Sequence, residues 1–358
     1  MKNLKNKQIY FISTLVIFIL ANSCDTPSLK EIKDLEVPRM YIANFTQEDP
    51  LIDGQIDEVW DQAVYSEHYI DIEGKTTPLY PTQMKMLWNK EFLYILAKIE
   101  EPHVWGNLKQ RDTVIFYNND FEVFIDPDGD THQYMELEIN ALNTTWDLFL
   151  ERPYRNKVKV DNTWNIEGLK SAVSYQGTLN DPSDIDLGWT LEIALPWNAL
   201  ERGNPSGTIP VNQFWRMNFS RVNWQFDLVN NKYMRKKDDE GKYVPEFNWV
   251  WSPQGVINMH VPELWGYVFF SDGTLNDISY PQDASLLQWM YTHYRKIHSR
   301  AKKGLPPHKI QSALFYGEKV RMEKFISNDT LYWKTKNPIN KMTYQIREDG
   351  KLEIHSRP

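Results

Sequence analysis

The sequence predicts an all-β fold, an antiparallel β-sandwich followed by one C-terminal helix and a small β-meander. From Met40 onward, short segments with alternating polarity are separated by turn signals, a pattern typical of a sandwich. The 358 residues, with 41% hydrophobic content and 14 Trp, can bury a large core. Because the chain has a single cysteine, it has no intramolecular disulfide, and packing must hold the fold together.

The predicted strands begin with two hairpins. The first joins 84–88 to 92–99 through Asn89-Lys90-Glu91, and the second joins 121–126 to 133–140 through Pro127-Asp128-Gly129-Asp130. Further strands are predicted at 146–151, 169–175, 189–195, 215–222 and 265–271. Short helical turns are expected at 57–63 and 196–202, the second with Pro196 at its first position.

The composition changes after Ser271, and the remainder, 272–358, is predicted to be a C-terminal extension. Apolar residues at helical spacing predict a helix at 283–303, with Asp283 as its N-cap and Gly304 at its end. A β-meander is expected at 319–356, with turns at 327–329 and 348–350. This extension either packs on the sandwich or forms a separate unit.

The N-terminus predicts export. Three lysines precede the apolar run 9–20, and small residues come before Cys24, as in a secretory signal. The apolar run is too short for a confident membrane span. A signal that ends in a small residue followed by Cys resembles a bacterial lipoprotein signal. The resemblance implies cleavage after residue 23, acylation of Cys24, a tether at 24–39 and a place in the cell envelope, which we expect to be the outer membrane. The alternative is a plain secretory signal with an incidental Cys.

Charge and composition indicate the kind of partner. The net charge is −8, and removal of residues 1–23, which hold three Lys and no acid, makes it −11. An acidic body is a poor binder of polyanions, so nucleic acid is not an expected partner. Abundant Trp and Tyr beside acidic and amide groups suit carbohydrate better.

Five phrases, in this order, resemble those of the family 9 carbohydrate-binding modules. They are Ile52-Asp53-Gly54 with Asp57, Glu58 and Trp60; Asp120 to Asp126; Glu192 to Trp197; Asn218 with Arg221; and Trp251-Ser252-Pro253 with Pro262 and Gly266. The resemblance covers 40–271 and implies a DOMON-like sandwich, an immunoglobulin-like jelly roll. It also implies non-catalytic binding of mono-, oligo- or polysaccharide beside glycan-degrading enzymes, with structural calcium in some members.

Strand parity locates a candidate binding face. On 133–140, Tyr134, Glu136, Glu138 and Asn140 share one side, and Glu122 lies on the matching side of the partner strand. The alternative is the solvated outer face of an antiparallel sheet. Arg216 and Asn218 share a face of 215–222, Tyr117 and Trp105 are aromatics near the 121–126 strand, and Trp251 shares a face with Trp249. The predicted ligand-binding set is Glu122, Tyr134, Glu136, Glu138, Asn140, Arg216, Asn218, Tyr117, Trp105 and Trp251. Arg216 could instead neutralise a glutamate, and Trp251 could belong to the core with Trp249.

The sequence also departs from the family it resembles. Family members clamp the sugar between two tryptophans, but the corresponding stretches here, 114–119 and 256–260, contain none. An arginine that the family places on the central strand corresponds to Glu138. The resemblance therefore implies the scaffold more firmly than the ligand.

One loop is a candidate metal site. Asp126, Asp128 and Asp130 offer carboxylates at alternating positions, which hard cations such as calcium prefer. The spacing is not that of an EF-hand, and a Pro-Asp-Gly hairpin turn is the favoured interpretation.

The residues favour binding over catalysis. A glycosidase needs two carboxylates across a cleft, whereas Glu136 and Glu138 lie side by side on one strand. The sequence contains no zinc helix, phosphate loop or nucleophile elbow. His260 is expected to be structural or on the surface. Two alternatives stay open: an envelope lipoprotein that binds proteins through a sandwich without a sugar site, and a glycoside-active enzyme.

Overall fold

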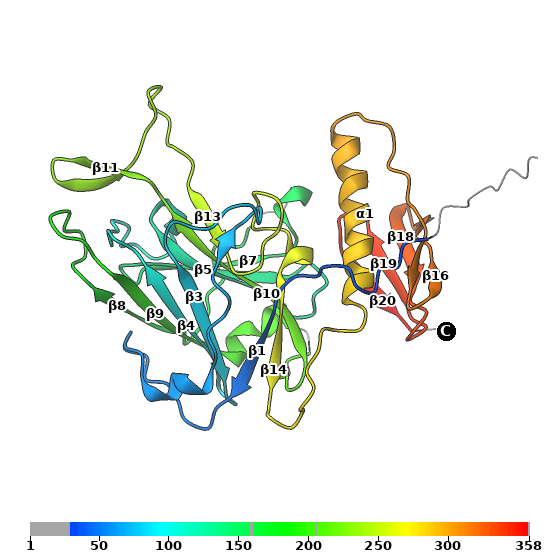
Figure 1. Ribbon diagram of the computed structural model, residues 1–358, viewed down its shortest axis with the longest axis horizontal. Coiled ribbons are helices and arrows are strands. Elements are labelled where there is room, and N and C mark those ends of the chain that lie inside the picture. Colours follow the sequence, from blue (N-terminus) through cyan, green and yellow to red (C-terminus); the bar gives the residue numbers. More distant parts are fainter. Residues whose placement is uncertain (1–28, 158–159, 205, 357–358) are drawn as a thin grey trace, which may run out of the picture.

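The computed structural model describes residues 29–157, 160–204 and 206–356, and its largest element is one sheet that curls into a sandwich-like fold (Figure 1). The signal segment and Cys24 lie outside the described residues. The strands follow the order β7-β6-β5-β10-β14-β1-β3-β4-β9-β8, and β13 pairs with both β10 and β2. Their bounds are β1 Met40–Phe45, β2 Ile70–Asp71, β3 Thr82–Trp88, β4 Phe92–Glu100, β5 Asp120–Asp126, β6 Tyr134–Asn140, β7 Thr145–Leu150, β8 Lys170–Gln176, β9 Gly188–Pro196, β10 Phe214–Asn223, β13 Phe247–Val250 and β14 Gly266–Ser271.

The two predicted hairpins are confirmed as β3–β4 and β5–β6, and the later strands begin and end close to their predicted bounds. The sheet is not wholly antiparallel, however, because β1 pairs in parallel with both β14 and β3. The sequence also did not predict the projecting hairpin of β11 (Phe226–Val229) and β12 (Lys232–Arg235).

The helical turns are confirmed as short 3₁₀ helices, η1 (Glu58–Gln62) and η4 (Trp197–Gly203). Three others are η2 (Ile115–Tyr117), η3 (Tyr154–Asn156) and η5 (Pro262–Leu264), and the first two lie next to β5 and β7 along the chain. Pro196 closes β9 and caps η4 rather than occupying its first position, because its backbone is extended.

Several motif residues hold the scaffold together. The buried Glu192 carboxylate accepts hydrogen bonds from the backbone N–H groups of Asp53 and Gly54, at 3.0 and 2.7 Å, and from Trp60 Nε1 at 2.7 Å. Gly54 has a positive φ of 85°, and a Cβ there would lie 2.7 Å from the backbone of β8, so this approach requires glycine. Two separate phrases of the sequence, 52–60 and 192–197, therefore meet at one buried carboxylate.

Trp249 and Trp251 belong to the main core, so the alternative of a core position for Trp251 is confirmed. Trp251 packs against Tyr41 and Phe219. Arg221, also buried, donates to Thr82 and to the Glu100 carbonyl, and lies 3.5 Å from the Glu101 carboxylate. Arg221 on β10, Trp249 on β13 and Trp251 directly after β13 thus stabilise the interior of the sandwich.

The C-terminal extension contains the predicted helix, α1 (Ala284–Lys302), and a four-stranded meander. The meander strands are β17 Glu323–Ser327, β18 Thr330–Lys336, β19 Thr343–Arg347 and β20 Leu352–His355, preceded by the hairpin of β15 Ala313–Phe315 and β16 Glu318–Val320. The side chain of Asp283 does not cap the helix; it accepts a hydrogen bond from the Tyr344 hydroxyl at 2.5 Å.

The extension packs on the sandwich, with α1 between the sandwich and the meander (Figure 1). The Thr131 hydroxyl and the Asn156 amide of the sandwich donate to the carbonyls of Gly350 and Asp349 in the extension, at 3.0 and 2.6 Å. Ile32, in the segment predicted as a tether, is 2% exposed and its N–H bonds the Leu314 carbonyl. The predicted tether is therefore not free along its whole length, because Ile32 packs against the C-terminal extension.

Within the described part of the chain, no helix is both long enough and apolar enough to cross a membrane.

Candidate functional site

A cavity of about 380 Å³ opens on the face of β5, β6 and β7 that points away from the main core. This volume lies within the range of small-molecule sites. Strands supply its floor, and loops far apart in the sequence supply its rim. The lining residues are Ile72, Phe116, Glu122, Phe124, Glu136, Glu138, Trp146, Leu148, Tyr154, Val222, Glu246, Asn248, Ile257, Asn258, Met259 and His260.

Three of the predicted residues, Glu122, Glu136 and Glu138, meet in this cavity, and the alternative of a solvated outer face is wrong because all three are buried. Strand alternation places them together, since Phe121, Val123 and Ile125 point the other way into the main core. Burial raises the pKa of Glu122 to about 7 and raises those of Glu136 and Glu138 well above their usual range. The cavity floor is thus a group of desolvated carboxyls.

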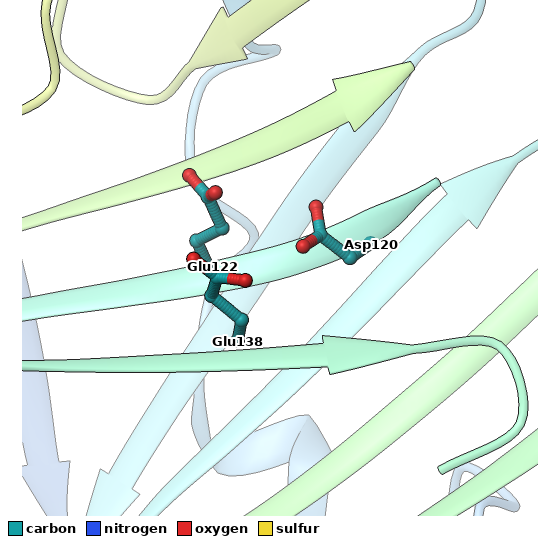
Figure 2. A group of neighbouring side chains, drawn as sticks. All are labelled: Asp120, Glu122 and Glu138. Carbon is teal, nitrogen blue, oxygen red and sulfur yellow. The ribbon is translucent and has the colours of Figure 1, made fainter. Parts of the chain in front are cut away.

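Asp120, which is not among the predicted residues, lies beside Glu122 and Glu138 (Figure 2). It precedes Glu122 by two residues on β5, so both side chains rise from the same face. Burial, followed by the charge of Glu122, raises the pKa of Asp120 well above its usual range. The same parity rule that selected Glu122 would have found Asp120.

Aromatic side chains line the cavity next to the carboxyls. Trp146 on β7 is directly opposite Glu138 in the β6–β7 register, and its indole N–H is buried without a hydrogen-bond partner. Tyr154, 42% exposed, stands edge-on to His260, with 4.2 Å between the ring centroids. Neither aromatic is among the predicted residues: strand parity could have found Trp146, whereas Tyr154 lies in η3, outside the paired strands.

His260 contacts the neighbouring side chain of Tyr134, which fits the expected structural role, and it also borders the cavity. Its Nδ1 lies 2.9 Å from the Tyr134 hydroxyl. Its Nε2 is 4.0 Å from Glu136, which is too long for a hydrogen bond. Burial lowers the pKa of His260 to about 3, so the ring is neutral and does not neutralise the glutamate.

The other predicted ligand-binding residues do not line the cavity. Tyr134 lies below it, and Asn140 bonds the Leu108 carbonyl and the turn after β6. Arg216 donates to the carbonyls of Glu263 and Trp265 rather than to a ligand or a glutamate, and Asn218 holds the backbone of Ser252.

The three predicted aromatics are also elsewhere. Trp105 is buried and stacks on Tyr233, whereas Trp251 is in the main core. Tyr117 is 43% exposed and lies under the Arg235 guanidinium, at 4.3 Å. None of the three lines the cavity, because an aromatic that is close to a site in the sequence need not face it in space.

The loop with Asp126, Asp128 and Asp130 brings its carboxylates within 4.8 Å of one another. However, Asp126 accepts hydrogen bonds from the N–H groups of Gly129 and Thr131, as in a tight turn. Asp130 is paired with Lys351 of the extension at 2.9 Å. These contacts favour the hairpin-turn interpretation and give the loop a role in docking the extension.

Fold and site together define a β-sandwich protein with a small, partly aromatic and strongly acidic cavity on one sheet face. Residues 52–248 match the sequence profile described as "Carbohydrate family 9 binding domain-like", which is more than half of the chain. The chain belongs to this family.

Curated relatives share the same region. The chain is 26% identical over 163 residues to Exoglucanase XynX of Acetivibrio thermocellus, a match covering 45% of this chain and 12% of that protein. It is 24% identical over 194 residues to Endo-1,4-beta-xylanase A of Thermotoga maritima, covering 51% of this chain and 17% of that protein. The chain therefore spans only a small part of these relatives.

Two solved structures are similar in part. A putative carbohydrate-binding protein from Bacteroides uniformis aligns with a TM-score of 0.48 at 14% identity, over 65% of this chain and 99% of that one. A family 9 module from Caldicellulosiruptor kristjanssonii in complex with cellotriose aligns with a TM-score of 0.42 at 15% identity, over 67% of this chain and 100% of that one.

Proposed function

We propose that the protein binds carbohydrate non-catalytically in the cavity over β5, β6 and β7. The observation that carries this proposal is the combination of aromatic faces and carboxyls within one cavity of about 380 Å³. Aromatic rings pack on the apolar C–H faces of a pyranose, while carboxylates and amides accept and donate hydrogen bonds at its hydroxyls. Trp146 and Glu138, on neighbouring strands, offer both kinds of contact side by side.

Family membership supports the same function, and the named relatives suggest where to look for the ligand. Those relatives carry the names of an exoglucanase and of endo-1,4-β-xylanases. Glucose-, cello- and xylo-oligosaccharides are therefore the first compounds to test, followed by a wider panel of soluble glycans.

We further propose that the protein is a lipoprotein exported to the cell envelope, anchored through Cys24, which captures glycans for degradation. The basic, apolar and small-residue succession before Cys24 supports this part of the proposal. Because one acyl chain holds a protein at a membrane only marginally, stable anchoring would require more than one. Metabolic labelling with a fatty-acid analogue tests it: label should be incorporated into the wild type and lost in Cys24→Ser.

Isothermal titration calorimetry of the full chain against the glycan panel tests the binding. We expect saturable binding of at least one sugar, and no release of reducing ends during long incubation. The absence of binding across a broad panel would refute the proposal, and release of reducing sugar that disappears in Glu136→Gln would show an enzyme instead.

A further inference from the structure

Three carboxyl groups converge in the cavity floor without a cationic side chain to balance them. Asp120, Glu122 and Glu138 each bring one oxygen within 4.8 Å of the others, and all three are buried (Figure 2). Elsewhere in the protein, buried carboxylates such as Glu263 and Asp147 pair with arginine. No ion pair in the described residues includes any member of this trio.

The oxygens of this trio are also short of hydrogen bonds. Neither oxygen of Asp120 has a partner at bonding geometry, and neither does Glu122 Oε2. The hydroxyl of Ser220, opposite Glu122 on β10, has none either. Glu138 Oε2 accepts one bond, from the Phe116 N–H at 2.9 Å. Buried polar atoms nearly always have partners, so several unpartnered oxygens that face one another point to a bound group.

The donor set indicates which group would fit. All three residues offer carboxylate oxygen, and the cluster includes no imidazole or thiolate, which favours a hard cation. Two oxygens on opposite sides of Ca²⁺ lie about 4.6–5.2 Å apart, against about 4.2 Å for Mg²⁺. The three oxygens, which all lie within 4.8 Å of one another, satisfy this limit for Ca²⁺.

We propose that Asp120, Glu122 and Glu138 bind a Ca²⁺ ion in the cavity floor, and that this ion bonds hydroxyl groups of the carbohydrate. The second part rests on the proposed function. Calcium takes six to eight oxygen ligands, and three carboxylates leave positions for further oxygens. Because Glu122 and Glu138 line the cavity, those positions face the space that a sugar would occupy. Two neighbouring sugar hydroxyls are ligands of the required kind.

Calorimetry of the full chain with CaCl₂, after removal of metal with EDTA, tests the ion site. We expect one tight site in the wild type and at least a tenfold loss of affinity in Asp120→Asn and in Glu138→Gln. Asp128→Asn is the matched control, because it removes a carboxylate from the other acidic group and should leave this affinity unchanged. Equal Ca²⁺ affinity in the wild type and both trio variants, or loss in Asp128→Asn alone, would overturn the proposal.

Terbium luminescence gives a second readout that does not depend on a variant of the trio. Tb³⁺ replaces Ca²⁺ and is excited by a nearby indole, and Trp146 lines the same cavity. We expect sensitised emission that Ca²⁺ displaces and that falls severalfold in Trp146→Phe. Emission that Trp146→Phe leaves unchanged would place the ion elsewhere and overturn the assignment.

Carbohydrate titrations in Ca²⁺ and in EDTA separate the two proposals. At least a tenfold weaker binding in EDTA would support the bridging ion. Equal binding in both buffers would overturn the bridging role while the proposed function stands. Calcium binding at the trio without binding of any sugar would support the ion site and refute the carbohydrate function.

Discussion

Glu122 on β5 and Glu138 on β6 are directly opposite each other in the antiparallel register, and both side chains are buried. Like charges at directly opposed positions destabilise a sheet. A chain selected only for stability would place an apolar pair here, as it does at the neighbouring pair of Val123 and Leu137. The glutamate pair is therefore a position that costs the sheet stability, which is the pattern expected of the proposed binding site.

Removing one of these charges should stabilise the metal-free protein. In Glu138→Gln, the amide oxygen can still accept the hydrogen bond from Phe116, while the burial of an ionised carboxyl and its repulsion with Asp120 and Glu122 are removed. We expect the free energy of unfolding to rise by about 0.5–1 kcal/mol in EDTA. Urea denaturation at pH 8 measures it, and a clear loss of stability would contradict this account of the pair.

The substitution Glu192→Gln, unlike Glu138→Gln, should lower the free energy of unfolding. Its two oxygens accept three hydrogen bonds, from the N–H groups of Asp53 and Gly54 and from the Trp60 indole. An amide group in Glu192→Gln would point a donor at these donors and leave buried N–H groups unpaired. We expect a loss of about 1–3 kcal/mol in the same urea experiment. If Glu138→Gln and Glu192→Gln change the free energy of unfolding in the same direction, the two carboxylates do not differ in their contribution to stability, and this prediction is wrong.

Trp146 should contribute to carbohydrate affinity through its ring. Its truncation in Trp146→Ala removes an aromatic surface from the cavity wall without touching the main core, to which this residue does not belong. We expect a loss of about 1–2 kcal/mol, or roughly 5- to 30-fold in Kd. Calorimetry with the best glycan measures it. Tyr117→Ala is the control, since that ring lies outside the cavity lining, and an equal loss there would contradict the assignment.

The strands and their faces could be predicted because alternation is a local rule. The rule brought Glu122, Glu136 and Glu138 together correctly, and applied one step further it would have added Asp120 and Trp146. Their positions depend only on parity and on the pairing of adjacent strands.

The remainder of the site depends on contacts that no local pattern contains. Arg216 and Asn218 lie on strand β10 next to β5, but the segment around Ser252 and Trp265 covers them and takes their hydrogen bonds. Tyr154 and the 257–260 loop reach the cavity from distant parts of the chain. The sequence therefore predicted which side of the strands carries the cavity. It did not predict which part of that side is covered by segments from distant parts of the chain.

The docking of the extension should weaken in acid through Asp349. This carboxylate bonds His132 of the sandwich at 3.2 Å and Arg347 of the meander at 2.6 and 2.8 Å. Although burial opposes the effect, these hydrogen bonds hold the pKa of Asp349 well below its usual range. A lowered pKa in the folded state stabilises the protein above the pKa of the unfolded state, about 4, and this stabilisation is lost as the pH falls below it.

The substitution Asp349→Asn should therefore cost about 1–3 kcal/mol at pH 7 and progressively less as the pH falls below about 4. Urea unfolding at pH 7, 4 and 2.5 measures this difference against the wild type. Asp329→Asn is the control, because Asp329 is exposed in the β17–β18 turn and its left-handed backbone suits asparagine. A cost of Asp349→Asn that is the same at all three pH values would show that shape, and not charge, holds the extension on the sandwich.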